Sequence, residues 1–241
     1  SLGIGPEGTV YATTKDDEIY WLDRREMEWK PATGKARQIA VGPGGAPWAV
    51  TAEKQLMASG ISLTERAAKT ETARVAETKQ NPTPPVLTIV APAPSQTKPL
   101  SYQTLAGDLK FQDIGIGGNG AVFGVGGDGG LYCFSNPDTR FILASPGKNQ
   151  RITVTPGGAL WVVSTNGTAS RFENRQWMSV PEFSGKDIAS GPDGQIWASG
   201  IDGQSYRYNT ATARFAIVAV TRADKAFKAR RVAGGNADIL W

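Results

Sequence analysis

Histidine is absent from this sequence of 241 residues, and cysteine occurs once, as Cys133. Without histidine, a serine or cysteine nucleophile has no imidazole base, and zinc loses its commonest ligand. A single cysteine excludes an internal disulfide. No apolar run reaches the length of about 18 residues that a membrane-spanning helix needs, so we expect no transmembrane segment.

Motifs that carry common chemistries are missing as well. The sequence has no calcium-loop spacing of aspartates, no phosphate-binding P-loop and no dinucleotide-type glycine motif before a helix. Its 26 basic and 22 acidic residues leave a net charge of only +4, and the basic residues are scattered. We therefore expect no catalytic residues, no cofactor, no metal and no nucleic-acid partner.

One phrase recurs along the chain: an Ile- or Val-containing strand, a glycine turn and an aromatic strand. Copies begin at Leu2, Ile39, Ile114, Ile152, Ile188 and, in a degenerate form, Arg231. Each full copy has an aromatic anchor three residues after the second glycine of its turn. These anchors are Tyr11, Trp48, Phe123, Trp161 and Trp197, and Trp241 ends the sixth copy. A regular repeat of this kind indicates a repeat architecture.

The turns GPEG, GPGG and GPDG place proline where φ is fixed and glycine where φ can be positive, which predicts antiparallel strand pairs. Each unit then continues with two more strand-like segments. Four short strands in about 37 residues are typical of a propeller blade. We predict an all-β fold, a β-propeller of four-stranded antiparallel blades that forms a single domain. The predicted blades cover residues 1–36, 37–109, 110–150, 151–185 and 186–226, with a partial sixth at 227–241.

The partial sixth copy leaves the closure of the ring open. A six-bladed ring is favoured, and it would need further strands from a longer protein or from another chain. The alternative is a five-bladed ring with residues 227–241 as an appended hairpin.

Residues 60–99 interrupt the repeat as an insertion within blade 2. The first half contains good helix formers, and the second half is rich in proline and therefore extended. A single hydrophobic run stands out, formed by Val86, Leu87, Ile89 and Val90. The insertion is either a tolerated surface loop or an arm that adds a strand to a partner's sheet through this run.

The segment from Trp177 to Trp197 resembles the tectonin repeat. It matches the pattern W-x-x-V-P-x-x-x-G-x-x-I-x-x-G-P-D-G-x-I-W through Val180, Pro181 and Gly185. The resemblance implies a five- or six-bladed propeller that binds sugars or bacterial lipopolysaccharide, or that serves as a protein-interaction module. Tyr11 and Phe123 stand where the family has tryptophan, so individual binding positions transfer poorly.

Two functions are therefore expected from the sequence. The first is a lectin-like propeller that recognises surface glycans or lipopolysaccharide, and the alternative is an assembly subunit or protein-interaction scaffold that docks through residues 60–99. The candidate ligand-binding residues are Trp48, Trp161, Trp197, Trp21 and Tyr102. Aromatic residues at fixed positions of a repeat can instead pack between sheets. The compartment is left open, with an extracellular, cell-surface or periplasmic location favoured over the cytoplasm.

Overall fold

The structure is a computed structural model, and it describes residues 1–59, 102–105, 107–135, 140–218, 221–222, 225–226 and 231–234. The predicted insertion at 60–99 and the predicted anchor Trp241 lie outside these residues. Within the described residues, no helix is long and apolar enough to cross a membrane.

Strands of three to eight residues make up the first three sheets, each in chain order. Blade 1 contains β1 (Leu2–Ile4), β2 (Val10–Thr13), β3 (Glu18–Asp23) and β4 (Glu28–Lys35). Blade 2 contains β5 (Gln38–Val41), β6 (Pro47–Val50), β7 (Leu56–Ser59) and β8 (Tyr102–Leu105), with the 3-10 turn η1 (Pro43–Gly45) between β5 and β6. Blade 3 contains β9 (Phe111–Ile116), β10 (Val122–Gly126), β11 (Leu131–Ser135) and β12 (Arg140–Ser145).

The next two blades share one long strand, β16 (Gln176–Ser190). Blade 4 contains β13 (Asn149–Val154), β14 (Leu160–Ser164), β15 (Thr168–Glu173) and the first half of β16. Blade 5 contains the second half of β16, β17 (Ile196–Gly200), β18 (Ser205–Asn209) and β19 (Arg214–Val218). A separate hairpin of β20 (Thr221–Arg222) and β21 (Lys225–Ala226) follows.

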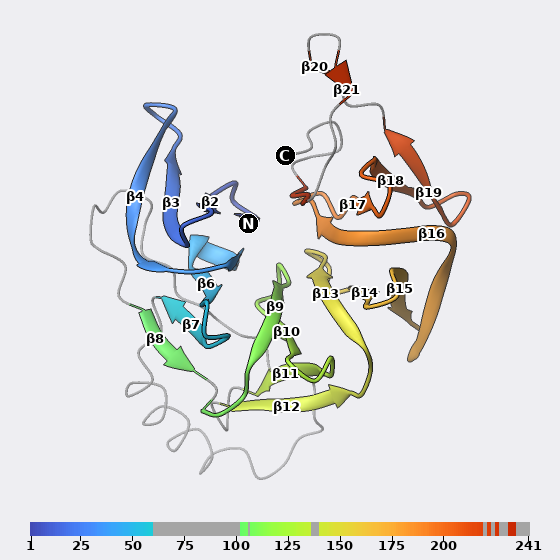
Figure 1. The fold of residues 1–241 in the computed structure, drawn as a ribbon, viewed down its shortest axis with the longest axis horizontal. Helices are drawn as coiled ribbons and strands as arrows, with labels where there is room; N and C mark the ends of the chain where they lie inside the picture. Colours follow the sequence, from blue (N-terminus) through green and yellow to red (C-terminus); the bar gives the residue numbers. More distant parts are fainter. Residues whose placement is uncertain are drawn as a thin grey trace, which may run out of the picture.

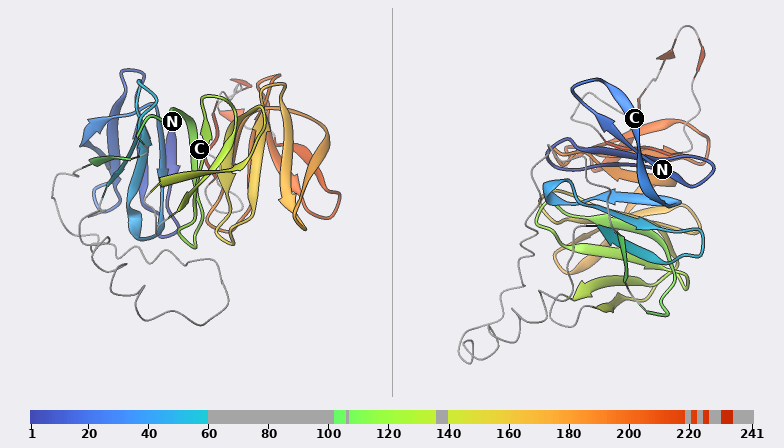
Figure 2. Two further views of the ribbon diagram at one scale, coloured as in Figure 1. Left: turned by 90° about the horizontal axis from the view of Figure 1, so that it is seen from below. Right: turned by 90° about the vertical axis from the view of Figure 1, so that its left-hand side faces the viewer.

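The five blades stand around a common axis, with the first strand of each nearest the centre (Figure 1). Seen from the side, the sheets stand next to one another around a flat disc (Figure 2). Consecutive first strands contact each other from β1 through β5, β9 and β13 to β16. The prediction of an all-β propeller with four-stranded antiparallel blades is confirmed.

The turn glycines adopt the conformation that the sequence predicts. The second glycine of each turn has a φ between 75° and 87°, a region that L-residues with a side chain rarely adopt. These glycines are Gly8, Gly45, Gly120, Gly158 and Gly194. In each turn, the N–H of this second glycine donates a hydrogen bond to the carbonyl oxygen three residues earlier. For example, the Gly158 N–H donates to the Thr155 carbonyl. This fixed geometry sets the distance from the turn to the anchor and explains the constant sequence offset.

Close approach of the first strands also requires small residues near the axis. A Cβ on Gly3 of β1 would lie 2.9 Å from the carbonyl oxygen of Ile39 in β5. A Cβ on Gly115 of β9 would lie 3.1 Å from Val154 in β13. Both contacts are too short for an unmoved neighbour, so these glycines allow adjacent blades to pack at the centre.

Candidate functional site

The three anchor tryptophans predicted as ligand contacts lie inside the protein. Trp48 has no exposed surface, Trp197 is 2% exposed and Trp161 is 5% exposed. The Trp48 ring meets Phe134 of blade 3 at 5.5 Å between centroids, and Trp161 meets Tyr208 of blade 5 at 4.7 Å. These contacts are what packing between blades requires, and they leave little indole face for a ligand.

The partners of the anchors are residues that sequence reasoning missed. Phe134 in β11 lies opposite Phe141 in β12, and both pack with Trp48. Tyr208 in β18 lies opposite Phe215 in β19, and both contact Trp161. A cross-strand aromatic pair on the third and fourth strands therefore covers the anchor of the preceding blade. The recurring Arg-Phe at the start of the fourth strand was the sequence signal for it.

The remaining predicted ligand residues lie between blades 1 and 2. Trp21 and Tyr102 pack against the same buried cluster, which includes Tyr11. The ammonium of Lys30 lies 5.9 Å from the centre of the Trp21 ring. The structure thus brings Trp21 and Tyr102 together, whereas the three anchor tryptophans belong to three different blades. The predicted partner-binding residues Val86, Leu87, Ile89 and Val90 lie outside the described residues.

Of the five predicted ligand residues, Trp161 lines a pocket between blades 4 and 5. The pocket has a volume of about 280 Å³. Arg171, Asp193 and Tyr208 contribute to its wall, and the Arg171 guanidinium lies 5.6 Å from the centre of the Tyr208 ring. Since Trp161 is 5% exposed and Tyr208 is 4% exposed, these two rings offer a ligand little surface.

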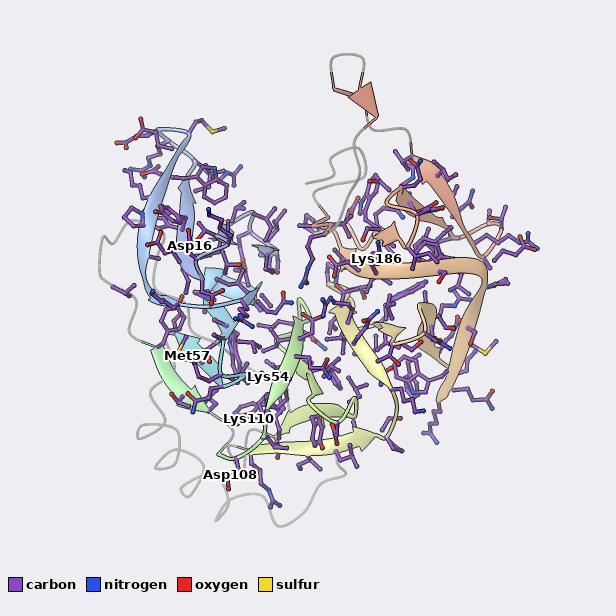
Figure 3. All side chains as sticks on the ribbon, viewed as in Figure 1. Asp16, Lys54, Met57, Asp108, Lys110 and Lys186 are labelled. Atoms are coloured by element: carbon purple, nitrogen blue, oxygen red, sulfur yellow. The ribbon has the colours of Figure 1, made fainter. Side chains whose placement is uncertain are left out.

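A ring of polar residues surrounds the axis, and this ring was not predicted. Each member stands ten residues before the anchor of its copy, which was the sequence signal for it. We call the set the axial ring, and its members are Ser1, Gln38, Asp113, Arg151, Asp187 and Arg231. All of them except Arg151 line a cavity of about 110 Å³ on the axis, together with residues of the first strands. Lys186, which is labelled in Figure 3, directly precedes Asp187 on β16.

Hydrogen bonds run from the axial ring to the next blade. Asp113 Oδ2 accepts from the N–H of Ile152 at 2.9 Å, which links blade 3 to blade 4. Asp187 Oδ2 accepts from the N–H of Val232 at 3.0 Å, which links blade 5 to residues 231–234. Because the two bonds are equivalent, residues 231–234 stand where the first strand of a sixth blade would stand.

The two arginines of the axial ring share one carboxylate oxygen. Arg151 Nε lies 3.3 Å and Arg231 Nη1 lies 3.6 Å from Asp187 Oδ1. Arg231 Nη1 also donates to Gln38 Oε1 at 3.1 Å, across the axis. Although Arg151 Nε is close to the carboxylate, the geometry is not that of a hydrogen bond, and this buried nitrogen has no other partner.

Burial controls the titration of the carboxyl groups in the axial ring. Burial raises the pKa of Asp113 to about 6, against an opposing effect of the Arg151 guanidinium. Burial also raises the pKa of Asp187, although Arg231 and the Val232 N–H oppose the change. Desolvation of the charged form therefore outweighs the nearby positive charges at both positions.

The raised pKa of Asp113 predicts a pH dependence of folding. An unfolded aspartate titrates near pH 3.9, so the folded protein holds this proton more tightly, and stability is lost as the pH rises from 4 through about 6. Asp113→Asn removes this titration and keeps an acceptor for the Ile152 N–H. Between pH 4 and 7.5, the wild type should lose about 2–3 kcal/mol relative to Asp113→Asn in denaturant unfolding.

A matched variant checks this assignment. Asp108→Asn changes an exposed carboxyl, labelled in Figure 3, and should retain the pH dependence of the wild type. Parallel pH profiles of the wild type and Asp113→Asn would contradict the prediction.

The outermost strands differ in how well their outer edges are protected. β4 contains Pro31 and the outer half of β16 contains Pro181, and proline blocks pairing of an added strand. β8 and β19 contain no proline either, and β12 has neither a proline nor a charged residue after Arg140. Within the described residues, no strand pairs with the outer side of β12.

Exposed apolar side chains gather beside this edge. On β12, Ile142 is 41% exposed and Leu143 is 52% exposed. Ile142 lies opposite Cys133, and Cys133 lies opposite Phe123, so the three side chains share the face toward blade 4. Phe123 packs there on the same cluster as Trp177.

Blade 4 supplies an aromatic pair on the same side. Phe172 of β15 lies opposite Trp177 of β16, and their ring centroids are 5.2 Å apart. Phe172 remains 39% exposed. We call Ile142, Phe172 and Trp177 the rim patch.

Solved structures with the same fold are β-propellers. The match to the β-propeller domain of Cps50 (Swd1) from Myceliophteria thermophila covers 96% of this chain and 75% of that chain, with a TM-score of 0.56 and 11% identity. The structure of YCF48 bound to D1 peptide covers 89% and 65%, with a TM-score of 0.50 and 11% identity. Human WBSCR16 covers 94% and 67%, with a TM-score of 0.56 and 13% identity.

These likenesses place the chain in the class of β-propellers and, at such low identity, show the fold alone. The chain spans between 65% and 75% of the length of the three similar structures. No sequence family matches the chain, and no curated protein is similar to it in sequence.

Proposed function

We propose that this protein is a non-catalytic propeller of tectonin-like repeats that binds an extended segment of a protein partner along β12. The observation that carries the proposal is the unprotected apolar edge of β12 beside the rim patch. An edge strand offers backbone N–H and C=O groups to an added strand, and neighbouring apolar side chains give the added strand its specificity.

Two further points favour a protein partner over a glycan. The tryptophans that supported sugar stacking are buried between blades, so the main argument for a lectin is weakened. Propellers of this architecture can hold peptides, since YCF48 was solved bound to D1 peptide. The docking arm at 60–99 stays a separate expectation, because its residues lie outside the described part of the chain.

The test compares peptide binding and glycan binding by the same purified protein. Extended peptides selected from a displayed library should bind the wild type with a measurable Kd in fluorescence anisotropy, whereas a glycan array should give no specific signal. Ile142→Lys places a charge on the β12 edge and should weaken peptide binding at least about tenfold, or about 1.4 kcal/mol.

Ile217→Lys is the matched control. Ile217 is 63% exposed on β19, the outer strand of blade 5, so the substitution has the same chemistry away from β12. It should leave peptide affinity within about twofold of the wild type. Specific glycan signals without peptide binding, or equal peptide binding by Ile142→Lys and the wild type, would overturn the proposal.

A further inference from the structure

A pair of facing aromatic residues on the third and fourth strands recurs in three consecutive blades. In each blade the first member directly follows the residue that lies opposite the blade's own anchor. The second member lies opposite the first on the fourth strand. The three pairs are Phe134–Phe141 of blade 3, Phe172–Trp177 of blade 4 and Tyr208–Phe215 of blade 5. Equivalent positions of a repeat face the same neighbour, so each pair faces the preceding blade.

The anchor of the preceding blade covers two of these pairs. The centre of the Trp48 ring lies 5.5 Å from that of Phe134, and the Trp161 ring lies 4.7 Å from Tyr208. Phe134 is accordingly only 9% exposed and Tyr208 only 4% exposed. An indole of the preceding blade is therefore the usual cover of such a pair in this protein.

The pair of blade 4 lacks this cover. The anchor of blade 3 is Phe123, whose ring is smaller than an indole and contacts no other aromatic ring among the described residues. Phe123 is half-buried, whereas the other anchors in the described part of the chain are at most 7% exposed. Phe172 is 39% exposed, against 9% for its equivalent Phe134. Aromatic surface that an indole covers elsewhere is thus exposed beside β12.

This surface faces the side chains of a strand added to β12. Ile142 and Phe123 lie on the face of blade 3 that is turned toward blade 4, because both lie opposite Cys133. Side chains of a strand alternate between the two faces of its sheet, so every second side chain of the added strand would point toward blade 4. Neighbouring blades diverge from the axis toward the rim (Figure 1), so a large side chain is needed to reach Phe172.

We propose that the segment bound along β12 carries an aromatic residue, above all tryptophan, whose ring packs on Phe172 and Trp177 and replaces the indole that blade 3 lacks. The inference rests on the proposed binding of an extended segment to β12 and adds a chemical requirement for one of its side chains. Aromatic rings prefer edge-to-face or offset contacts with other rings, and an aliphatic side chain cannot supply such contacts.

The first experiment compares two peptides that differ in one side chain. Extended peptides selected from a displayed library against the wild type should share an aromatic residue at one position. Replacing that tryptophan by leucine in a fluorescently labelled peptide should raise the Kd about tenfold in anisotropy. Phe172→Ala changes an exposed side chain and should remove this preference, so that both peptides bind within about twofold of each other.

A second variant supplies the missing indole from the protein itself. In Phe123→Trp, the new ring should cover Phe172 as Trp48 covers Phe134. The preference for the tryptophan peptide should then disappear, while the melting temperature should not fall. A loss of function by general unfolding would lower the melting temperature as well, so the two measurements together separate occupation of the site from damage to the fold.

Trp29→Ala is the matched control. Trp29 is 44% exposed and occupies in blade 1 the position that Trp177 occupies in blade 4. Its removal deletes an equivalent exposed indole away from β12. The variant should keep the preference of the wild type for the tryptophan peptide.

A small probe tests the aromatic surface without an added strand. Fluoroindole should bind the wild type in fluorine NMR, and Phe172→Ala and Phe123→Trp should weaken this binding, whereas Trp29→Ala should not. Cys133 is the only cysteine of the chain and lies opposite Phe123. Fluoroindole and the tryptophan peptide should therefore each slow the alkylation of Cys133 by iodoacetamide.

The outcomes separate this inference from the binding of a segment to β12. Peptide binding that responds to Ile142→Lys but not to the exchange of tryptophan for leucine would overturn only the aromatic requirement. Fluoroindole binding that depends on Phe172, without any peptide binding, would overturn strand addition and retain an aromatic site at the rim. If fluoroindole binding were absent or unchanged in Phe172→Ala, and no peptide bound, both proposals would be wrong.

Discussion

Replacing Trp48 by alanine should lower the free energy of unfolding by about 3–5 kcal/mol. The side chain has no exposed surface, and its ring packs on Phe134 between blades 2 and 3. Alanine would leave a cavity that strand backbones, held by hydrogen bonds on both sides, cannot close. The loss can be measured by denaturant unfolding that is monitored by far-UV circular dichroism rather than by tryptophan fluorescence.

Trp29→Ala is the matched control for this prediction. Trp29 lies on β4 and is 44% exposed, so its removal should cost within about 1 kcal/mol. If Trp48→Ala unfolded at the same denaturant concentration as the wild type but lost a ligand, Trp48 would be a binding residue. The contrast between the two variants therefore distinguishes packing from recognition.

The repeat made the fold predictable because its spacing is set by local geometry. Gly158 and Gly194 need positive φ, and the strand after each must bury one aromatic residue. Turn chemistry and period-two burial act within a few residues, so they leave a readable pattern. Blade 2 could be recognised despite its insertion for the same reason, since the strands on either side of it, β7 and β8, keep the strand pattern.

The candidate sites were less predictable because they depend on contacts between blades. Asp113 and Ile152 meet only when two blades stand side by side, and neither residue is unusual in its own repeat. The buried aspartates also look like ordinary polar strand residues in the sequence. The prediction of ligand tryptophans used residue type alone, whereas the exposure that decides such a role depends on Phe134 and Tyr208 of the neighbouring blades.

The edge of β12 shows the same limit. Its sequence, Arg140-Phe-Ile-Leu-Ala-Ser145, reads as a strand with apolar residues on both faces, which is also the pattern of a buried strand. The register places Ile142 and Leu143 at the outside of blade 3, where both are exposed. Position in the sheet, which the sequence does not state, turns an ordinary strand into a candidate binding edge.

The second large effect is expected for Asp187→Ala. This carboxylate holds the N–H of Val232 and lies beside both arginines of the axial ring. Removing it leaves the buried Val232 N–H without its acceptor and Arg151 without its carboxylate ion-pair partner, which should cost about 3–5 kcal/mol. The local loss of stability should be largest where residues 231–234 pack on the end of β16.

Local release of residues 231–234 can be measured separately from global stability. In hydrogen exchange, the Val232 amide should lose its protection in Asp187→Ala, and trypsin should cleave after Arg231 more rapidly. Asp187→Asn keeps an oxygen that can accept from Val232 and should retain most of the protection. Unchanged exchange at Val232 in Asp187→Ala would mean that the hydrogen bond does not hold this segment, and residues 231–234 would then not serve as the first strand of a sixth blade.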